Sequence, residues 1–120
     1  MTANILFGQF ISEKRIQNSM TKQELARQIG ISTAYLSQIE SGVRSNPKEY
    51  IVLRLINCLH LKEDEIYLLY DLYAAATDTI AIDVARYIKK NALAVKAIRA
   101  AEKYGAEESD WIRFIEQFSK

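Results

Sequence analysis

Apolar residues recur at helical spacing from the start of the chain. Between residues 4 and 17, Phe7, Phe10 and Ile11 lie three and four positions apart, the spacing that puts side chains on one buried face of a helix. Gly8 favours a start of this helix near that residue rather than earlier. The same period continues in most later segments, and the pattern as a whole predicts an all-α fold.

Two short helices with defined ends follow. Residues 21–24, with the sequence Thr-Lys-Gln-Glu, form a capping box, in which the threonine hydroxyl and the glutamate carboxylate accept hydrogen bonds from backbone N–H groups. The helix that begins there ends at Gly30, since glycine readily adopts the left-handed conformation found just past a helix. Ser32 is a good N-cap for a third helix of residues 33–41, which ends at Gly42.

The rest of the chain is also predicted to be helical. Pro47 is expected at the first position of a fourth helix, where its missing N–H costs nothing. Residues 77–79 give the best boundary, so that a five-helix domain (residues 1–76) precedes a helical C-terminal extension (residues 77–120). The last four helices are expected at about residues 63–76, 79–90, 92–104 and 107–118.

Composition supports this fold class and indicates where an anionic partner binds. The chain of 120 residues contains only four Gly and one Pro, whereas a β-sandwich or barrel needs many more turn residues. The net charge is +1, but residues 1–60 carry seven basic and four acidic residues, and residues 61–120 carry nine basic and eleven acidic ones. An anionic partner is therefore expected to bind the first half of the chain.

Few side chains are available for catalysis or metal binding. Cys58 and His60 are the single cysteine and the single histidine, so an intramolecular disulfide, a zinc site and a Ser-His-Asp triad are not expected. We therefore expect no enzymatic activity, no cofactor and no metal. The chain also lacks an apolar stretch long enough to span a membrane, and a cytoplasmic location is expected.

The segment from Thr21 to Gly42 has the layout of a helix-turn-helix. Two capped helices are joined by a turn that contains Gly30, and the small residue Ala26 lies where the two helices must cross closely. In such a unit the second helix enters the DNA major groove by its N-terminal end. Residues 10–60 resemble the DNA-binding domain of the phage-repressor and Cro-like (XRE) helix-turn-helix family. The residues that carry this resemblance are Lys14-Arg15-Ile16, Thr21-x-x-Glu24-Leu25-Ala26, Ile29-Gly30-Ile31-Ser32 and Tyr35-Leu36-Ser37-Gln38-Ile39-Glu40-Ser41-Gly42.

The resemblance implies roles for residues of the predicted third helix. The positions that contact bases in the family are occupied here by Thr33, Ala34, Ser37 and Gln38. The Gln38 amide can pair with adenine N6 and N7, whereas Ala34 offers only a methyl group to thymine. The alternative that Gln38 is an ordinary solvent-exposed residue remains open. The resemblance also implies an internal salt bridge between Arg15 and Glu40, which holds the first and third helices together.

Residues around the third helix are expected to contact the DNA backbone. The N-terminus of the second predicted helix offers N–H groups and polar side chains to a phosphate, and the loop before the fourth helix is basic and polar. The candidates are Lys22, Gln23, Ser32, Tyr35, Arg44, Ser45, Asn46 and Lys48. For Arg44 and Lys48, the alternative of ordinary exposed charges remains open.

The resemblance implies a bacterial or phage-type transcription regulator that binds double-stranded DNA as a homodimer. Family members normally bind pseudo-palindromic operators as two-fold dimers, and repression, unlike activation, requires only that the operator be occupied. The dimer contact, or the contact with another protein partner, is expected in apolar surfaces of the second half. The candidate interface residues are Tyr70, Tyr73, Trp111, Phe114 and Phe118. Two alternatives remain open: an antitoxin that neutralises a toxin and represses its own promoter, and an adaptor that binds proteins but no DNA.

Overall fold

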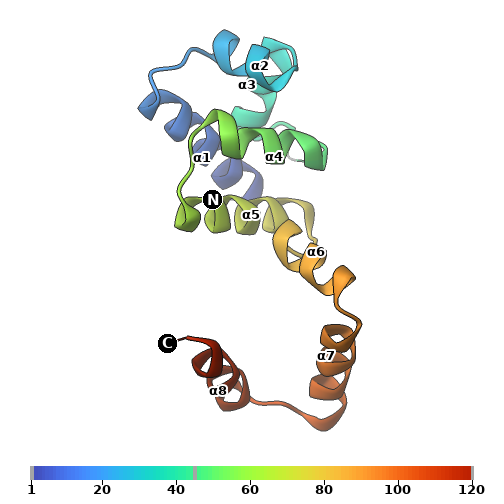
Figure 1. The fold of residues 1–120 in the computed structure, drawn as a ribbon. Helices are drawn as coiled ribbons and strands as arrows, with labels where there is room; N and C mark the ends of the chain where they lie inside the picture. The colour runs from blue at the N-terminus through green and yellow to red at the C-terminus, as the bar shows by residue number, and fades with distance from the viewer. Residues whose placement is uncertain (1, 45, 120) are drawn as a thin grey trace. The chain divides into compact units, whose positions relative to one another are not determined.

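The computed structural model describes residues 2–44 and 46–119, and all the regular structure in these residues is helical. The prediction of an all-α fold is therefore confirmed. The helices are α1 (Ala3–Gln17), α2 (Lys22–Ile29), α3 (Thr33–Ser41), α4 (Glu49–Cys58), α5 (Glu63–Thr77), α6 (Ile82–Lys90), α7 (Ala92–Tyr104) and α8 (Glu108–Phe118) (Figure 1). The chain divides into two compact units, Met1–Asp83 and Val84–Lys120.

The first unit is built around one hydrophobic core. α1 packs against α3 and α5, and α2 packs against α3 and α4 (Figure 1). Each of the helices α1 to α5 contributes apolar side chains to this core, and Ile82 at the start of α6 also belongs to it. The largest fully buried side chains include Phe7, Ile11, Leu25, Ile29, Leu36, Ile39, Leu55, Leu59 and Leu69.

The ends of α2 and α3 are fixed by their own neighbouring residues. The Thr21 hydroxyl accepts a hydrogen bond from the Glu24 N–H at 3.1 Å, and the Glu24 carboxylate accepts one from the Thr21 N–H at 3.3 Å. The Ser32 hydroxyl caps α3 by accepting from the Tyr35 N–H at 3.0 Å. Gly30 then ends α2 in the left-handed conformation, with a φ of 89°. The predicted caps of both helices are present, so the helix-turn-helix is defined by local sequence.

Gly8 does not begin α1, as the sequence pattern suggested, but lies within it. The helix begins at Ala3, and Thr2 is its N-cap. Gly8 is buried against α3: a Cβ atom added to it would lie 2.4 Å from the Glu40 carbonyl oxygen and 2.5 Å from that of Ile39. Glycine is therefore needed at this position because the two helix backbones approach each other closely.

Two later helices begin further along the chain than predicted. α4 begins at Glu49, with Lys48 as its N-cap, so Pro47 precedes the helix instead of opening it. Pro47 is buried, and its carbonyl group is engaged by a side chain of α5, which holds the residue outside the helix. α6 begins at Ile82 rather than near residue 79, because Asp78 ends α5 in the left-handed conformation and the next three residues are not helical.

The second unit contains most of α6 together with α7 and α8. Gly105 ends α7 with a φ of 71°, and the Glu107 N–H donates to the Asp110 carboxylate at 2.8 Å at the start of α8. The Asp110 carboxylate also pairs with Arg113, and its pKa is lowered by the Glu107 N–H and then by the Arg113 guanidinium. Neither α7 nor α8 contains a buried residue.

Candidate nucleic-acid interface

The four predicted base-contacting residues lie on the outer face of α3. Thr33, Ala34 and Gln38 are exposed, and Ser37 is partly buried. On the inner face Leu36 and Ile39 are each only 1% exposed, because they pack into the core of the first unit. The structure thus brings the four side chains together on one helical surface whose opposite side is fixed by packing.

A buried ion pair joins α3 to α1. The Arg15 guanidinium donates from Nε to Glu40 Oε2 at 2.8 Å and from Nη2 to Glu40 Oε1 at 3.1 Å. Its third donor, Nη1, lies 2.9 Å from the Met20 carbonyl oxygen. The two charged side chains are 11% and 5% exposed. Because the guanidinium and the carboxylate form a bidentate pair, the contact fixes the orientation of α3 as well as its distance from α1.

The N-terminus of α2 presents the first group of backbone-contact candidates. Lys22 and Gln23 are exposed there, next to amide groups and a helix dipole that both favour an anion. Ser32 is exposed as well; its oxygen caps α3, and its hydroxyl proton is available for a further acceptor. Tyr35 is partly buried and packs against the core.

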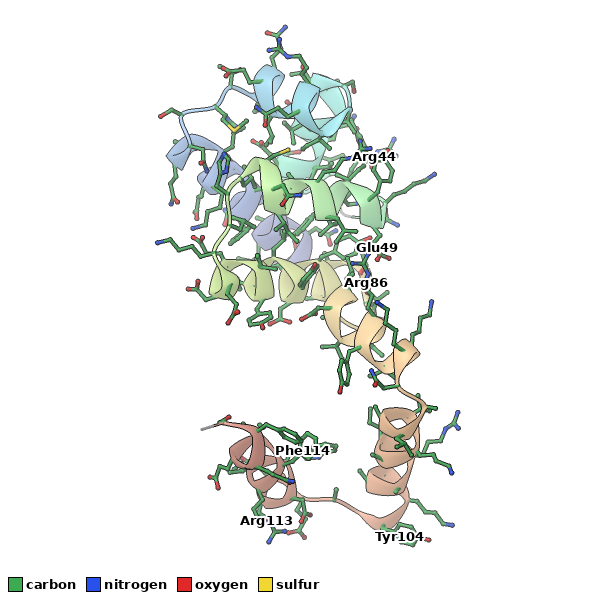
Figure 2. The ribbon with its side chains drawn as sticks, in the orientation of Figure 1. Arg44, Glu49, Arg86, Tyr104, Arg113 and Phe114 are labelled. Carbon is green, nitrogen blue, oxygen red and sulfur yellow. The ribbon has the colours of Figure 1, made fainter. Side chains whose placement is uncertain are left out.

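The connection between α3 and α4 carries the other backbone-contact candidates. Arg44, Asn46 and Lys48 are exposed, and Figure 2 shows Arg44 at this connection. Ser45, also predicted to contact the backbone, lies outside the described residues. The Arg44 N–H donates to the Gln38 carbonyl oxygen at 3.0 Å, so the start of the connection is tied to the helix that carries the base-contact candidates.

The far end of this connection is tied to α5. The Tyr73 hydroxyl donates to the Pro47 carbonyl oxygen at 2.6 Å, and the Tyr73 ring packs on Phe7 with 5.6 Å between ring centroids. Burial, followed by the charge of Glu49, raises the pKa of Tyr73. The hydroxyl therefore remains a protonated donor at neutral pH.

The five predicted interface residues separate into two groups. Tyr70 is 8% exposed and belongs to the core, and Tyr73 is partly buried against Phe7. Both tyrosines thus contribute to packing within the first unit instead of forming an exposed surface, because the face of α5 that carries them packs inward. The aromatic residues of α8 are exposed: the exposed fractions are 44% for Trp111, 54% for Phe114 and 70% for Phe118.

Arg54 joins α4 to the end of α2 in a contact that the sequence pattern does not predict. Its Nη1 donates to the Ile29 carbonyl oxygen at 2.5 Å, and its guanidinium lies 4.9 Å from the centre of the Tyr50 ring. A cation at this point suits the negative end of the α2 dipole. No local motif signals the contact, because donor and acceptor are 25 residues apart in the chain.

Within residues 2–44 and 46–119, no helix is long and apolar enough to cross a membrane. The same described part of the chain contains no group of three or more His, Cys, Asp or Glu side chains that could hold a metal ion.

Residues 11–66 match the protein-family model described as Helix-turn-helix. The matched segment runs from α1 to the first turn of α5 and contains the whole of α2, α3 and α4. No curated protein and no solved structure matches the chain. The family match agrees with the capped α2, the left-handed Gly30 and the capped α3, and it identifies this segment as an XRE-type helix-turn-helix domain, the DNA-binding domain of a family of transcription regulators.

Proposed function

We propose that the protein is a transcriptional repressor that binds a pseudo-palindromic operator as a homodimer, with α3 of each copy in a major groove. The observation that carries this proposal is the outer face of α3, which exposes small and polar side chains while the inner face is packed. A helix-turn-helix dimer contacts two half-sites about one turn of DNA apart, and each copy supplies one such helix.

The residues of the outer face differ in what they contribute to base recognition. The Gln38 amide offers a donor and an acceptor that match adenine N6 and N7, a pairing that contributes about 1–3 kcal/mol of discrimination. Thr33 contributes a hydroxyl and a methyl group, and Ala34 only a methyl group, which contacts the methyl group of thymine. Because Ala34 is so short, sequence-dependent DNA shape contributes to recognition at its position.

The residues around α3 fix the protein on the duplex. Lys22, Arg44 and Lys48 supply positive charge on two sides of the helix-turn-helix, and such phosphate contacts set register without carrying sequence information. Exposed polar side chains next to them add hydrogen bonds to phosphate oxygens: Gln23, Ser32 and Asn46. The hydrogen bond from the Tyr73 hydroxyl to the Pro47 carbonyl oxygen holds the α3–α4 connection in position for these phosphate contacts.

Repression suits this arrangement because occupancy of the operator is sufficient to block transcription. The function requires no reaction and no cofactor, so the protein acts as a regulator and not as an enzyme. Because the partner is double-stranded DNA, we place the protein with the nucleoid in the cytoplasm.

Selection of bound fragments from random duplex DNA tests the proposal. The wild-type protein is expected to select a two-fold motif, and Gln38→Ala is expected to lose selectivity at one position in each half-site. Gln117→Ala, which removes an exposed glutamine from α8, is the matched control and should select the wild-type motif. If the folded wild-type protein selects no motif, the proposed function is wrong.

A further inference from the structure

The helices of the second unit leave their large apolar side chains in solvent. α7 and α8 contain 13 and 11 residues and no buried side chain, whereas isolated helices of this length are marginal in water. Five aromatic side chains of this unit are between 44% and 77% exposed: Tyr87, Tyr104, Trp111, Phe114 and Phe118. These helices therefore need a further apolar surface to pack against.

A groove within the second unit provides the place for such packing. It has a volume of about 400 Å³ and is lined by Ala97 and Ala101 of α7, by Trp111 and Phe114 of α8, and by Tyr87 of α6. Figure 2 shows Phe114 on the side of α8 that faces α7. The small alanines leave the α7 wall shallow, so the groove has room for large side chains from another helix.

The apolar surface of α8 is wider than the groove it lines. Trp111 and Phe114 face the groove, while Ile112 and Ile115 lie further around the helix and are 46% and 60% exposed. At 100° per residue, the apolar positions of α8 cover well over a third of the helix circumference. Such a broad surface serves two neighbouring helices rather than one.

We propose that the groove is filled by α8 of a second copy of this chain, which inserts Ile112, Ile115 and Phe118 and receives the same residues in its own groove. The two-fold exchange forms a bundle of α7 and α8 from both copies. This interface rests on the homodimer of the proposed function and specifies the surface that joins the two copies.

Charge distribution favours a second copy in this arrangement. Residues 84–104 carry six basic residues and one acidic residue, whereas residues 105–119 carry four acidic residues and one basic residue. If α8 packed only on α8 of the partner, two acidic segments would face each other. Insertion beside α7 of the partner instead brings the acidic segment of each copy to the basic segment of the other.

The exposed area is also of the size that a dimer needs. At about 200 Å² for each aromatic side chain, the five exposed aromatic residues alone leave on the order of 600 Å² accessible. A stable interface buries about 800 Å² on each partner, and the exposed aliphatic residues of α7 and α8 supply the remainder.

Cross-linking between two single-cysteine chains tests the exchange. In a Cys58→Ser background, Ala97→Cys and Ile115→Cys are placed in separate full-length proteins of different mass, so that every disulfide formed on oxidation is intermolecular. An equimolar mixture is expected to give mainly the mixed species, because residue 115 of one copy lies in the groove of the other. Cross-linking mainly between two copies of the Ile115→Cys protein, or no cross-linking, overturns the proposal.

Sedimentation equilibrium gives an independent measurement on full-length chains. The wild-type chain is expected to be a dimer at tens of micromolar, and Ile115→Glu should raise the dimer dissociation constant by at least about 30-fold, as loss of a buried anchor does. Gln117→Glu, on the polar side of α8, should change it by less than about 3-fold, while the free energy of unfolding of the first unit, which has its own core, stays the same in both variants. A wild-type monomer overturns the interface. A dimer with the mixed cross-link that selects no DNA motif retains the interface and contradicts the proposed function.

Discussion

The Tyr73 hydroxyl donates a 2.6 Å hydrogen bond to the Pro47 carbonyl oxygen, across 26 positions of sequence. The bond joins α5 to the connection that carries Arg44, Asn46 and Lys48. A residue outside the helix-turn-helix motif thus holds part of the proposed backbone-contacting surface. The position of this surface depends on α5 as well as on α3 and α4.

Replacing Tyr73 with phenylalanine removes this bond and keeps the ring. Loss of the hydrogen bond is expected to lower the free energy of unfolding by about 1 kcal/mol and to weaken operator binding several-fold. Because the folded pKa of Tyr73 is raised above its usual value of 10, this hydroxyl stabilises the fold below pH 10 and loses that contribution as the pH rises through the folded pKa. Urea unfolding between pH 8 and 11 should therefore show a smaller alkaline loss of stability in Tyr73→Phe. An equal loss in both proteins would contradict this role.

Breaking the Arg15–Glu40 pair should destabilise the first unit strongly. Arg15→Ala leaves the carboxylate of Glu40 buried without its partner, and the expected loss in unfolding free energy is about 3–5 kcal/mol. Arg27→Ala, which removes an exposed arginine of α2, should change it by less than about 0.5 kcal/mol. Urea unfolding compares the two variants. If Arg15→Ala unfolds like the wild-type protein but loses DNA binding, Arg15 contacts DNA instead of supporting the fold.

Gly8→Ala should separate α1 from α3. An alanine Cβ would lie 2.4 Å from the backbone oxygen of Glu40, so the helices must move apart at an expected cost of about 1–3 kcal/mol. Over most of this range the cost exceeds the gain of about 1 kcal/mol that alanine usually gives in a helix. Thermal unfolding of the Gly8→Ala protein is compared with that of Glu13→Ala, a substitution at an exposed position of the same helix. A more stable Gly8→Ala protein would show that the close approach is not required.

Arg44→Ala should weaken DNA binding without changing its sequence preference. If Arg44 neutralises one phosphate, its loss lowers the affinity for matched and unmatched duplexes alike and reduces the slope of log affinity against log salt by about 1. Titrations at several salt concentrations measure both quantities. Lys62→Ala removes a cation at the start of α5 and should leave the slope unchanged. An unchanged slope in Arg44→Ala would make Arg44 an ordinary exposed charge.

The features of the fold that could be predicted from sequence are mainly those that residues within a few positions of each other determine. The capping box at Thr21, the cap at Ser32 and the left-handed Gly30 each involve residues within a few positions, so the bounds of α2 and α3 could be predicted. α7 also ends at Tyr104, as predicted, and Gly105 follows it in the left-handed conformation. Apolar spacing likewise predicted the buried face of α1, on which Phe7, Phe10 and Ile11 lie.

The features that sequence alone did not predict depend on contacts between distant segments. From sequence alone, Gly8 predicts the start of a helix, but in the fold it lies against the backbone of Glu40. Pro47 likewise fits the first turn of a helix, but it lies before α4, where Tyr73 donates to its carbonyl oxygen. In the sequence, Tyr70 cannot be distinguished from an aromatic residue of an interface. Only the packing of α5 on α1 identifies it as a core residue. The Arg15–Glu40 contact followed from the family resemblance, which carries such long-range information.

The separation of α3 into an inner and an outer face has a consequence for how proteins of this kind diverge. Substitutions at Thr33, Ala34 or Gln38 alter the outer surface without disturbing Leu36 or the rest of the core. Under the proposed function, mutational drift and selection can therefore act on operator preference while the stability of the scaffold is kept. After gene duplication, a few substitutions on the outer face of α3 would then be enough for two copies to bind different operators. Each substitution can be acquired separately, because the protein stays folded after each one.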